Sequence, residues 1–441
     1  MQTVITYYKN LTRWDIKSYL CLFSSPYAVE ELGKYIYEHS EKENIGKEAE
    51  KEFPILGVTN KVGVYLNEYV KGKNINQPYK KVRGGELTYN PYRVNIGSIG
   101  IVQKEYDNFY ISPAYVVFGT KEGLLNEYIY LVLSSSWFNQ YLRAATSGSV
   151  RQNLTFDLLS QLKVPIPPLK IQEKIVSDWH NSKKEAQKLD KKTNEKVKAI
   201  SDLVLFELGL KNKEYKKEKG AFVVYFREFE RWGIGFNDYL RQGLLDFKSK
   251  YEITTLDKII LGFQYGTSEK ANEIEGIPIL RMNNIINGDL DTSDLKYIKL
   301  SEKEFKSLKL VKGDILFNRT NSKELVGKTA VFNSVGDFVF ASYLIRVKID
   351  EKKADPTYIN ILFNSPIIRN QIDAISRQII GQANINTEEL GNFKFPLPLL
   401  PKQKEIAKKV EAIRAEIAEI KDKANGVLET TQKEIGKMLK A

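Results

Sequence analysis

Two stretches of the chain carry apolar residues at spacings of three and four, the period of one face of an α-helix. The apolar stripe in each stretch is narrow and flanked by lysine and glutamate, which is typical of a helix packed against one partner helix. The first stripe is Ile175, Trp179, Ser182, Ala186, Leu189, Thr193, Val197, Ile200, Val204 and Leu208, and the second is Ile406, Val410, Ile413, Ile417, Ile420, Ala424, Leu428, Thr431, Ile435 and Leu439. At 1.5 Å per residue, each helix reaches about 60 Å. A charged surface helix on its own globular domain is the alternative, but two stripes of equal length favour pairing with each other.

Each stripe is preceded by the same junction, in which a Pro-x-Pro element is followed by a glutamine. The segment "VPIPPLKIQEKIV" begins at Val164 and "FPLPLLPKQKEIAKKV" begins at Phe395, with the glutamines Gln172 and Gln403 lying 231 residues apart. Proline holds the backbone extended and excludes an earlier helix start. The junction therefore predicts a change from a globular part to a helix at both places.

The repeat extends backwards from the junctions through the globular parts, and its order never changes. The matching segments are "RWDIKSYL" (13–20) and "RWGIGFNDYL" (231–240), "FPILGVTN" (53–60) and "IPILRMNN" (277–284), "GELTYN" (85–90) and "GDILFN" (313–318), "GSIGIV" (97–102) and "GKTAVF" (327–332), "YISPAYVVF" (110–118) and "FASYLIRVK" (340–348), and "YIYLVLSS" (128–135) and "YINILFNS" (358–365). Repeats of roughly 220 residues are too long for a solenoid unit. We therefore expect a duplicated domain with approximate internal two-fold symmetry.

Each repeat mixes two kinds of apolar pattern. Residues 110–118 and 340–348 read as strands, while 125–145 and 356–375 read as helices. Asn386, followed by Glu389, is expected to cap a short helix.

The predicted fold class is α+β, with two mixed α/β modules and two long helices. The predicted domains are a first module at 1–165, a first helix at 166–212, a second module at 213–396 and a second helix at 397–441.

Composition narrows the functional class. The 441 residues carry a net charge of +12, which favours a polyanionic partner. One cysteine, Cys21, permits no intramolecular disulfide, and His39 and His180 are too sparse for a zinc cluster. The chain shows neither a secretory signal pattern nor a run approaching the roughly 18 apolar residues of a membrane span. These features predict a soluble protein of the cytoplasm.

Two short motifs suggest catalysis, and each lacks a required residue. "YNPY" at 89–92 resembles the Asn-Pro-Pro-Tyr motif of adenine methyltransferases, but the second proline is missing and the repeat counterpart "FNRT" does not retain the motif. "GKT" at 327–329 resembles the end of a phosphate loop, but Ser322 stands where that loop needs a glycine. The sequence thus predicts no catalytic residue, no metal ligand and no cofactor, although scattered acidic residues leave a magnesium nuclease site as an alternative.

Recognition of DNA is the remaining interpretation. Basic side chains attract phosphates, and Arg, Asn and Gln read base edges. Such residues gather on corresponding loops of the two repeats. The candidates are Arg83, Arg93, Asn95, Arg151, Gln152 and Asn153 in the first module, and Arg281, Asn283, Asn284, Arg319, Asn321, Lys323, Lys328, Arg377, Gln378, Gln382 and Asn384 in the second.

The duplicated junctions, the pair "GDILFNRT" and "GKTAVF", and the order module, helix, module, helix resemble the specificity subunits of Type I restriction-modification systems. The resemblance implies that each module is a target recognition domain reading one half of a bipartite DNA sequence. It also implies that the helices pack antiparallel as a spacer in a pseudo-two-fold arrangement. In one departure, the chain enters the first module without a long conserved segment before it, which leaves open how the ends close a ring.

The same resemblance implies partners. Modification subunits, expected to number two, and restriction subunits dock on the helical spacer. S-adenosylmethionine, ATP and magnesium are expected on those partners. The competing hypotheses are a self-sufficient adenine methyltransferase or nuclease, and a coiled-coil scaffold that joins two protein-binding domains.

Overall fold

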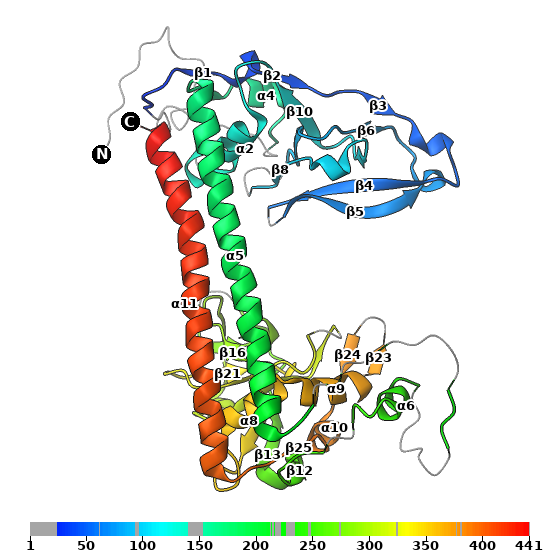
Figure 1. Cartoon of the computed structure of the whole chain (residues 1–441), viewed down its shortest axis with the longest axis vertical. Coiled ribbons are helices and arrows are strands. Elements are labelled where there is room, and N and C mark those ends of the chain that lie inside the picture. Colours follow the sequence, from blue (N-terminus) through cyan, green and yellow to red (C-terminus); the bar gives the residue numbers. More distant parts are fainter. Residues whose placement is uncertain are drawn as a thin grey trace. The chain divides into compact units, whose positions relative to one another are not determined.

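The computed structural model divides the chain into two compact units, Met1–Asp190 with Asp422–Ala441, and Lys191–Lys421. Each unit contains one mixed α/β module and a part of each of two long helices (Figure 1). The structure describes residues 24–60, 62–92, 97–139, 153–211, 213, 216, 222–225, 234–245, 248–272, 275–322, 325–375, 377–379 and 382–440.

The long helices are α5, Leu169–Leu208, and α11, Leu400–Leu439, of 40 residues each. They lie within the two segments that the apolar stripes and junctions predict. In combination with the two mixed α/β modules, they confirm the predicted fold class.

In the first unit, the start of α5 packs against the end of α11. Ile175 and Ile435 belong to one hydrophobic cluster with the core of the first module. The hydroxyl oxygens of Ser182 and Thr431 lie 2.6 Å apart. Because lower numbers in α5 meet higher numbers in α11, the helices run antiparallel in this unit.

In the second unit, the end of α5 packs against the start of α11. Val204 shares the core cluster of the second module with Val410. The carboxylate of Glu207 accepts a hydrogen bond from Lys409 Nζ at 2.6 Å and forms an ion pair with Lys402 Nζ at 2.8 Å. These contacts show that the helices run antiparallel in this unit as well. We call the cluster of Glu207, Lys402 and Lys409, which joins the two helices, the lock.

The predicted stripes form most of the seam between the helices. Among the residues predicted to pack there, the buried or half-buried ones are Ile175, Trp179, Leu189, Ile200, Val204, Ile406, Val410, Ile413, Ile417, Ile420 and Ile435. The prediction for Val197 is wrong, because this side chain is 47% exposed. The helical period instead places Lys196 toward α11, where its ammonium pairs with Glu416.

The glutamine in each junction has a structural role, which accounts for its presence in both copies of the repeat. Gln172 and Gln403 are fully buried. Gln172 Oε1 accepts from the backbone N–H of Leu125 at 2.9 Å, and Gln172 Nε2 donates to the carbonyls of Gly123 and Pro167, both at 2.9 Å. One amide side chain thus ties the first turn of the helix to the loop before α2 (Asn126–Ser134).

A buried tyrosine fixes the extended segment of each junction. The hydroxyl of Tyr128 donates to the carbonyl of Pro165 at 2.7 Å, and the hydroxyl of Tyr358 donates to the carbonyl of Pro396 at 2.7 Å. Burial raises the pKa of both phenols, so they remain donors.

Each junction also forms a two-stranded antiparallel sheet with the first described strand of its module. The strand pairs are β1 (Val29–Glu31) with β11 (Lys163–Pro165), and β12 (Ile253–Thr255) with β25 (Lys394–Pro396).

Both modules contain a four-stranded antiparallel sheet with corresponding strand order. In the first module the order is β2 (Ile36–Glu38), β10 (Val116–Thr120), β7 (Leu87–Tyr89) and β8 (Ile99–Ile101); in the second it is β13 (Ile260–Tyr265), β22 (Leu344–Ile349), β18 (Ile315–Asn318) and β20 (Thr329–Val331). The sequence pairs 85–90 with 313–318 and 97–102 with 327–332 supply equivalent strands, which supports the predicted duplication.

A second sheet in each module is built around one parallel strand pair. The strands are β4 (Glu52–Thr59) and β9 (Tyr110–Ile111) in the first module, and β14 (Ile277–Leu280) and β21 (Val339–Phe340) in the second. The first sheet has the order β3-β6-β9-β4-β5, with β3 (Lys42–Glu43), β5 (Gly63–Lys71) and β6 (Tyr79–Lys81); the second has β17-β14-β21, with β17 (Lys296–Ile298). The modules therefore share the central parallel strand pair and differ in the number of strands that flank it.

The runs predicted as single elements are interrupted in both modules. Residues 110–118 and 340–348 each form two strands, because a turn separates β9 from β10 and β21 from β22. The predicted helices break at equivalent serines, Ser135 after α2 (Asn126–Ser134) and Ser365 between α8 (Pro356–Phe363) and α9 (Pro366–Ile375). Pro366 cannot donate the backbone hydrogen bond that would continue α8.

The other α-helices among the described residues are short. They are α4 (Phe156–Ser160), α6 (Ile234–Arg241), α7 (Glu302–Leu308) and α10 (Thr387–Gly391). The predicted cap of α10 is confirmed, since Asn386 Oδ1 accepts from the N–H of Glu389 and the Glu389 carboxylate accepts from the N–H of Asn386.

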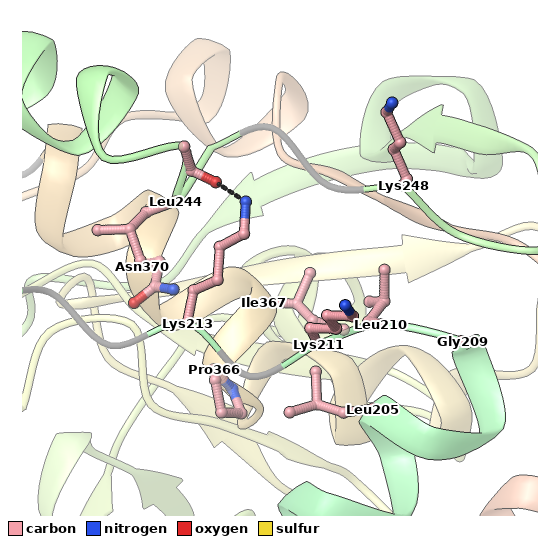
Figure 2. A pocket seen from close by; sticks show the side chains of 11 residues that line it. Leu205, Gly209, Leu210, Lys211, Lys213, Leu244, Lys248, Pro366, Ile367 and Asn370 are labelled. Atoms are coloured by element: carbon pink, nitrogen blue, oxygen red, sulfur yellow. Dashed lines mark hydrogen bonds between the residues drawn. The ribbon is translucent and has the colours of Figure 1, made fainter.

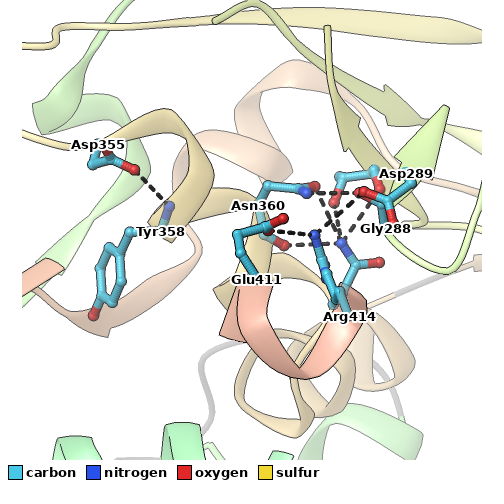
Figure 3. Close-up of polar contacts among 9 residues, drawn as sticks. Gly288, Asp289, Asp355, Tyr358, Asn360, Glu411 and Arg414 are labelled. Carbon is cyan, nitrogen blue, oxygen red and sulfur yellow. Dashed lines mark hydrogen bonds and ion pairs between the residues drawn. The ribbon is translucent and has the colours of Figure 1, made fainter. Parts of the chain in front are cut away.

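Within the second unit, α11 is also fastened to a hairpin of the module, β15 (Ile285–Ile286) and β16 (Asp289–Leu290). Figure 3 shows Arg414 between Glu411 on its own helix and Asp289 on the hairpin, with Nη1 to oxygen distances of 3.1 and 3.4 Å. Asn360 Nδ2 donates to the carbonyl of Gly288 at 2.8 Å. Gly288 has a φ of +90° and any side chain there would meet the Arg414 guanidinium, so the turn requires glycine.

Candidate nucleic-acid interface

A small three-stranded sheet in the second module gathers five of the predicted contact residues. Its order is β19 (Thr320–Asn321), β24 (Gln382–Asn384) and β23 (Arg377–Ile379). Asn321, Arg377, Gln378, Gln382 and Asn384 all belong to these strands. Segments that lie about 60 residues apart in the sequence thus place amide and guanidinium residues on one element.

Two described side chains of this sheet are joined by a hydrogen bond. Thr320 Oγ1 donates to Asn384 Oδ1 at 2.9 Å, and Asn384 is exposed. Because Asn384 Oδ1 accepts this bond, the amide is oriented with its Nδ2 amino group pointing away from Thr320. An amide held in this way can donate to a base edge without first losing rotamer freedom.

Arg319 precedes this sheet and is held against an aromatic ring. The guanidinium carbon of Arg319 lies 4.9 Å from the centre of the Tyr265 ring, within cation–π range. The backbone N–H of Arg319 donates to the carbonyl of Tyr343 at 3.0 Å, and its carbonyl accepts from Ile385. Tyr265 is 42% exposed and Tyr343 is 53% exposed. We call half-buried Arg319 and the two exposed residues that contact it, Tyr265 through its ring and Tyr343 through its backbone carbonyl, the Arg319 platform.

A buried contact between His39 and Glu86 positions the loop that carries Arg83 in the first module. The carboxylate of Glu86 accepts from the backbone N–H of Arg83 at 2.8 Å, while its other oxygen lies 2.7 Å from Nδ1 of His39. Both His39 and Glu86 are buried. The Arg83 side chain is left largely exposed, 3.7 Å from the carboxylate of Glu41.

The second module carries an equivalent arrangement in which a buried arginine faces the carboxylate. Asp314, which corresponds to Glu86, accepts from the backbone N–H of Val311 at 3.0 Å and faces the buried guanidinium of Arg346 at 3.4 Å. Burial lowers the pKa of Arg346, and the Asp314 charge opposes that shift. The guanidinium is further satisfied by the carbonyls of Lys309 and Ser307. Arg346 is therefore a structural cation that holds a turn in place.

Asn284 is corrected from a contact residue to a structural one. Its side chain is buried, with Oδ1 accepting from the N–H of Arg281 and Nδ2 donating to the carbonyls of Asp291 and Asp294. All of its hydrogen-bonding groups close a turn. Arg281 itself is half-buried, and its guanidinium donates to Asp294 at 3.2 to 3.3 Å.

The other predicted contacts are spread over the two modules. Asn283 is exposed, while Asn153 and Lys328 are half-buried. Arg93, Asn95, Arg151, Gln152 and Lys323 lie outside the described residues, as do the side chains of Asn321, Arg377, Gln378 and Gln382. Their roles stay predictions.

The Asn90 motif has a structural role in its described part. Asn90 Oδ1 accepts from the backbone N–H of Tyr92 at 3.0 Å, which closes a turn after β7. Tyr89 is buried, and burial raises the pKa of its hydroxyl. The repeat counterpart Asn318 is also buried and donates to the carbonyl of Leu325. The two asparagines therefore shape equivalent turns.

Sequence reasoning missed the aromatic half of the platform. Tyr265 ends a strand and Tyr343 sits in the turn before another, and neither lies in a basic or amide-rich run. Tyr343 lies within the matched segment 340–348 and Tyr265 lies in none of the matched segments, so the repeat gives no signal that would have marked Tyr265.

None of the helices in the described part of the chain is long and apolar enough to cross a membrane. No group of three or more His, Cys, Asp or Glu side chains among the described residues is placed to hold a metal ion.

Comparison with known proteins gives a consistent result. Residues 30–199 and 251–430 match the family described as Type I restriction modification DNA specificity domain. The matched ranges contain both modules and most of both long helices.

Two relatives illustrate the range of similarity. The Type I restriction enzyme EcoKI specificity subunit of Escherichia coli (strain K12) is 27% identical over 304 residues, which cover 67% of this chain and 60% of that protein, less than two thirds of its length. The Type I restriction enzyme MjaVIII specificity subunit of Methanocaldococcus jannaschii is 22% identical over 432 residues, which cover 92% of this chain and 89% of that protein.

A solved structure shares the fold. One chain of a type I R-M system, solved in work on complex assembly and conformational transition, superposes with a TM-score of 0.51 at 15% sequence identity. The superposition covers 95% of this chain and 100% of that chain.

Proposed function

The chain belongs to the Type I restriction modification DNA specificity family, and from this membership we propose that it is the DNA sequence-specificity subunit of a Type I restriction-modification complex. Each module reads one half of a bipartite DNA target. The observation that carries the proposal is the duplication: two modules with corresponding sheets, each fastened by the same buried glutamine to a long helix.

The platform around Arg319 is the base-reading surface of the second module. A guanidinium held by a tyrosine ring can donate to the O6 and N7 of a guanine, and a fixed asparagine amide can pair with an adenine. The support is geometric, since Arg319 contacts the ring of Tyr265 and the backbone of Tyr343, and the neighbouring Thr320 bonds the side chain of Asn384. In the first module the described candidate is Arg83, at a different position of the repeat.

The net charge of +12 supports the same proposal. Lysine and arginine neutralise DNA phosphates and release counterions, so binding weakens steeply as salt rises. Specificity then comes from base contacts summed over two half-sites, with about 1 to 3 kcal/mol lost per wrong base pair.

The helix pair sets the gap between the half-sites and docks the partners. Two modification subunits and the restriction subunits bind the chain, and they carry S-adenosylmethionine, ATP and magnesium. The chain itself is non-catalytic. This division is supported by the motif analysis, in which Asn90 lacks the second proline of a methyltransferase motif and uses its side chain to close a turn.

A reconstitution experiment tests this function. Methyl transfer to DNA is measured for the purified chain alone, for the modification subunit of the same system alone, and for both together. We expect sequence-specific transfer only from the mixture. Transfer by the chain alone would favour a self-sufficient methyltransferase, and weak, sequence-independent DNA binding by the mixture would favour a protein scaffold.

A further inference from the structure

Two asparagines occupy the same place in the two repeats. Asn153 and Asn384 lie 231 residues apart, the interval that also separates the junction glutamines. Each asparagine is followed by a buried aliphatic residue, Leu154 in the first module and Ile385 in the second. Between these asparagines and the junctions, the repeat therefore continues without a net insertion.

The backbone beside the two asparagines makes the same contact in both modules. The N–H of Leu154 donates to the carbonyl of Pro91 at 3.0 Å, and the N–H of Ile385 donates to the carbonyl of Arg319 at 3.0 Å. Pro91 and Arg319 are equivalent positions, because each follows an asparagine that shapes the turn after a strand of the four-stranded sheet. The hydrogen bonds thus agree with the equivalence that the sequence interval indicates.

Burial of the next residue leaves each asparagine side chain accessible. Asn384 ends strand β24, and successive side chains of a strand point to opposite faces. Ile385 belongs to the core cluster of the second module, so Asn384 points outward and is exposed. In the first module, Leu154 belongs to the core cluster in the same way, while Asn153 is half-buried.

The Asn384 amide is held differently from that of the structural asparagine in the same module. Asn284 is buried, and both ends of its amide bond to backbone groups of one turn. Asn384 Oδ1 accepts from the hydroxyl of Thr320 on the neighbouring strand at 2.9 Å. The amide of Asn384 is therefore oriented at the surface of the module.

The sheet that carries Asn384 is joined to a packed support. Helix α9 precedes this sheet, and Ile367 in its first turn lines one cavity with Leu205 at the end of α5 (Figure 2). Both residues belong to the core cluster of the second module. In the first module, Phe138 belongs to the core cluster that includes Ile435 of α11. A side chain supported by packed elements keeps the geometry that recognition requires.

We propose that Asn153 and Asn384 are equivalent specificity-determining residues, each reading the adenine of one A·T base pair in the half-site of its own module. The inference rests on the proposed function, which supplies the bipartite DNA. An asparagine amide presents one acceptor and one donor side by side, which matches the N6 donor and N7 acceptor of adenine in the major groove. Guanine presents two acceptors at these places, which one amide cannot satisfy with both of its groups.

Competition binding by the reconstituted complex tests the proposal. The chain is combined with the modification subunit of its own system, and binding to the target is compared with binding to duplexes in which each base pair of the half-sites is replaced in turn. Asn153→Ala and Asn384→Ala remove the amides. Asn153→Asp and Asn384→Asp keep the shape of the side chain but replace its donor with an acceptor. Asn194→Ala, at an exposed position of α5, is the control and should leave the preferences unchanged.

We expect each alanine variant to lose discrimination of about tenfold or more at one A·T pair, in one half-site for Asn153→Ala and in the other for Asn384→Ala. The aspartate variants should lose the same adenine preference and tolerate cytosine there, because a carboxylate accepts from cytosine N4. An equal loss of affinity for all sequences, unchanged discrimination, or a loss at a pair other than A·T would overturn the amide readers while leaving the proposed function intact. Absence of any sequence preference in the unchanged complex would overturn both.

Discussion

Gln172 and Gln403 make the same three hydrogen bonds in the two halves of the chain. Gln403 Oε1 accepts from the N–H of Asp355 at 2.8 Å, as Gln172 Oε1 accepts from Leu125 at 2.9 Å. Gln403 Nε2 donates to the carbonyls of Pro398 and Lys353, matching the two bonds of Gln172 Nε2. Each glutamine fastens a module to its helix, so each is expected to matter equally for the joint between them.

Replacing either glutamine by leucine should weaken its own module. The substitution leaves a buried N–H and two buried carbonyls without their partner, at a cost of about 1 to 3 kcal/mol. Gln172→Leu and Gln403→Leu should lower the free energy of unfolding, measured by urea denaturation, by similar amounts. Gln187→Leu, on an exposed position of the same helix, is the matched control and should have little effect. Equal stability of all three variants would contradict the role of the junction.

The lock between Glu207, Lys402 and Lys409 predicts a specific acid sensitivity. Hydrogen bonds from Lys402 and Lys409 lower the pKa of Glu207 to about 2. A carboxylate with a depressed pKa stabilises the folded state above its unfolded pKa, near 4.5, and this stabilisation disappears as the pH falls toward 2. Glu207→Gln should therefore reduce stability at pH 7, and the difference from the unchanged chain should shrink between pH 4.5 and 2.

Urea denaturation at pH 7, 4 and 3 measures this difference. Glu185→Gln, at an exposed position of α5 with no ion pair among the described residues, is the control and should follow the unchanged chain at every pH. A constant difference between Glu207→Gln and the unchanged chain across this range would show that the lock does not titrate as expected.

The sequence predicts the repeated frame well because its strongest signals are periodic and local. The stripes fix the long helices, and the Pro-x-Pro junctions fix where they begin. The exception at Val197 arises because a spacing of either three or four fits the pattern there, and only contact with Glu416 selects Lys196 for the seam.

The contact surface is predicted less completely because it depends on tertiary placement. Asn284 has the residue type of a base reader, but the fold uses its amide to close a turn. Tyr265 has no such sequence signal, and it becomes a candidate only because the fold brings it beneath Arg319. Residue type alone cannot separate an amide that faces a turn from one that faces solvent.

Arg319 should control recognition at one base pair of one half-site. Arg319→Ala and Arg319→Lys should each remove about 1 to 3 kcal/mol of discrimination at that pair, because lysine lacks the two-pronged donor geometry. Tyr265→Ala should weaken the same discrimination, whereas Tyr265→Phe keeps the ring and should retain most of it. Competition binding with single-base variants of the target measures the effect.

Lys352→Ala is the control for this series, since Lys352 is an exposed lysine in the loop before α8. It should lower affinity slightly and equally for all sequences, as loss of a surface charge does. The same uniform loss for Arg319→Ala would mean that Arg319 contacts only phosphates.

Shortening both long helices should shorten the gap in the recognised sequence. Deleting residues 184–190 and 423–429 removes one heptad from each helix at facing positions and keeps the stripes in phase. The loss of about 10 Å of helix corresponds to about three base pairs. Both half-sites should remain unchanged, and a changed half-site would mean that the helices take part in base reading.

Mapping of methylated adenines in cells that carry the complete system tests the central claim most directly. Two modules joined to two long helices predict a bipartite motif, with two specific half-sites separated by a gap of fixed length and unspecified sequence. Replacing the second module with that of a relative of different specificity should change one half-site and leave the other and the gap intact. A continuous motif, or a replacement that altered both half-sites, would contradict the account.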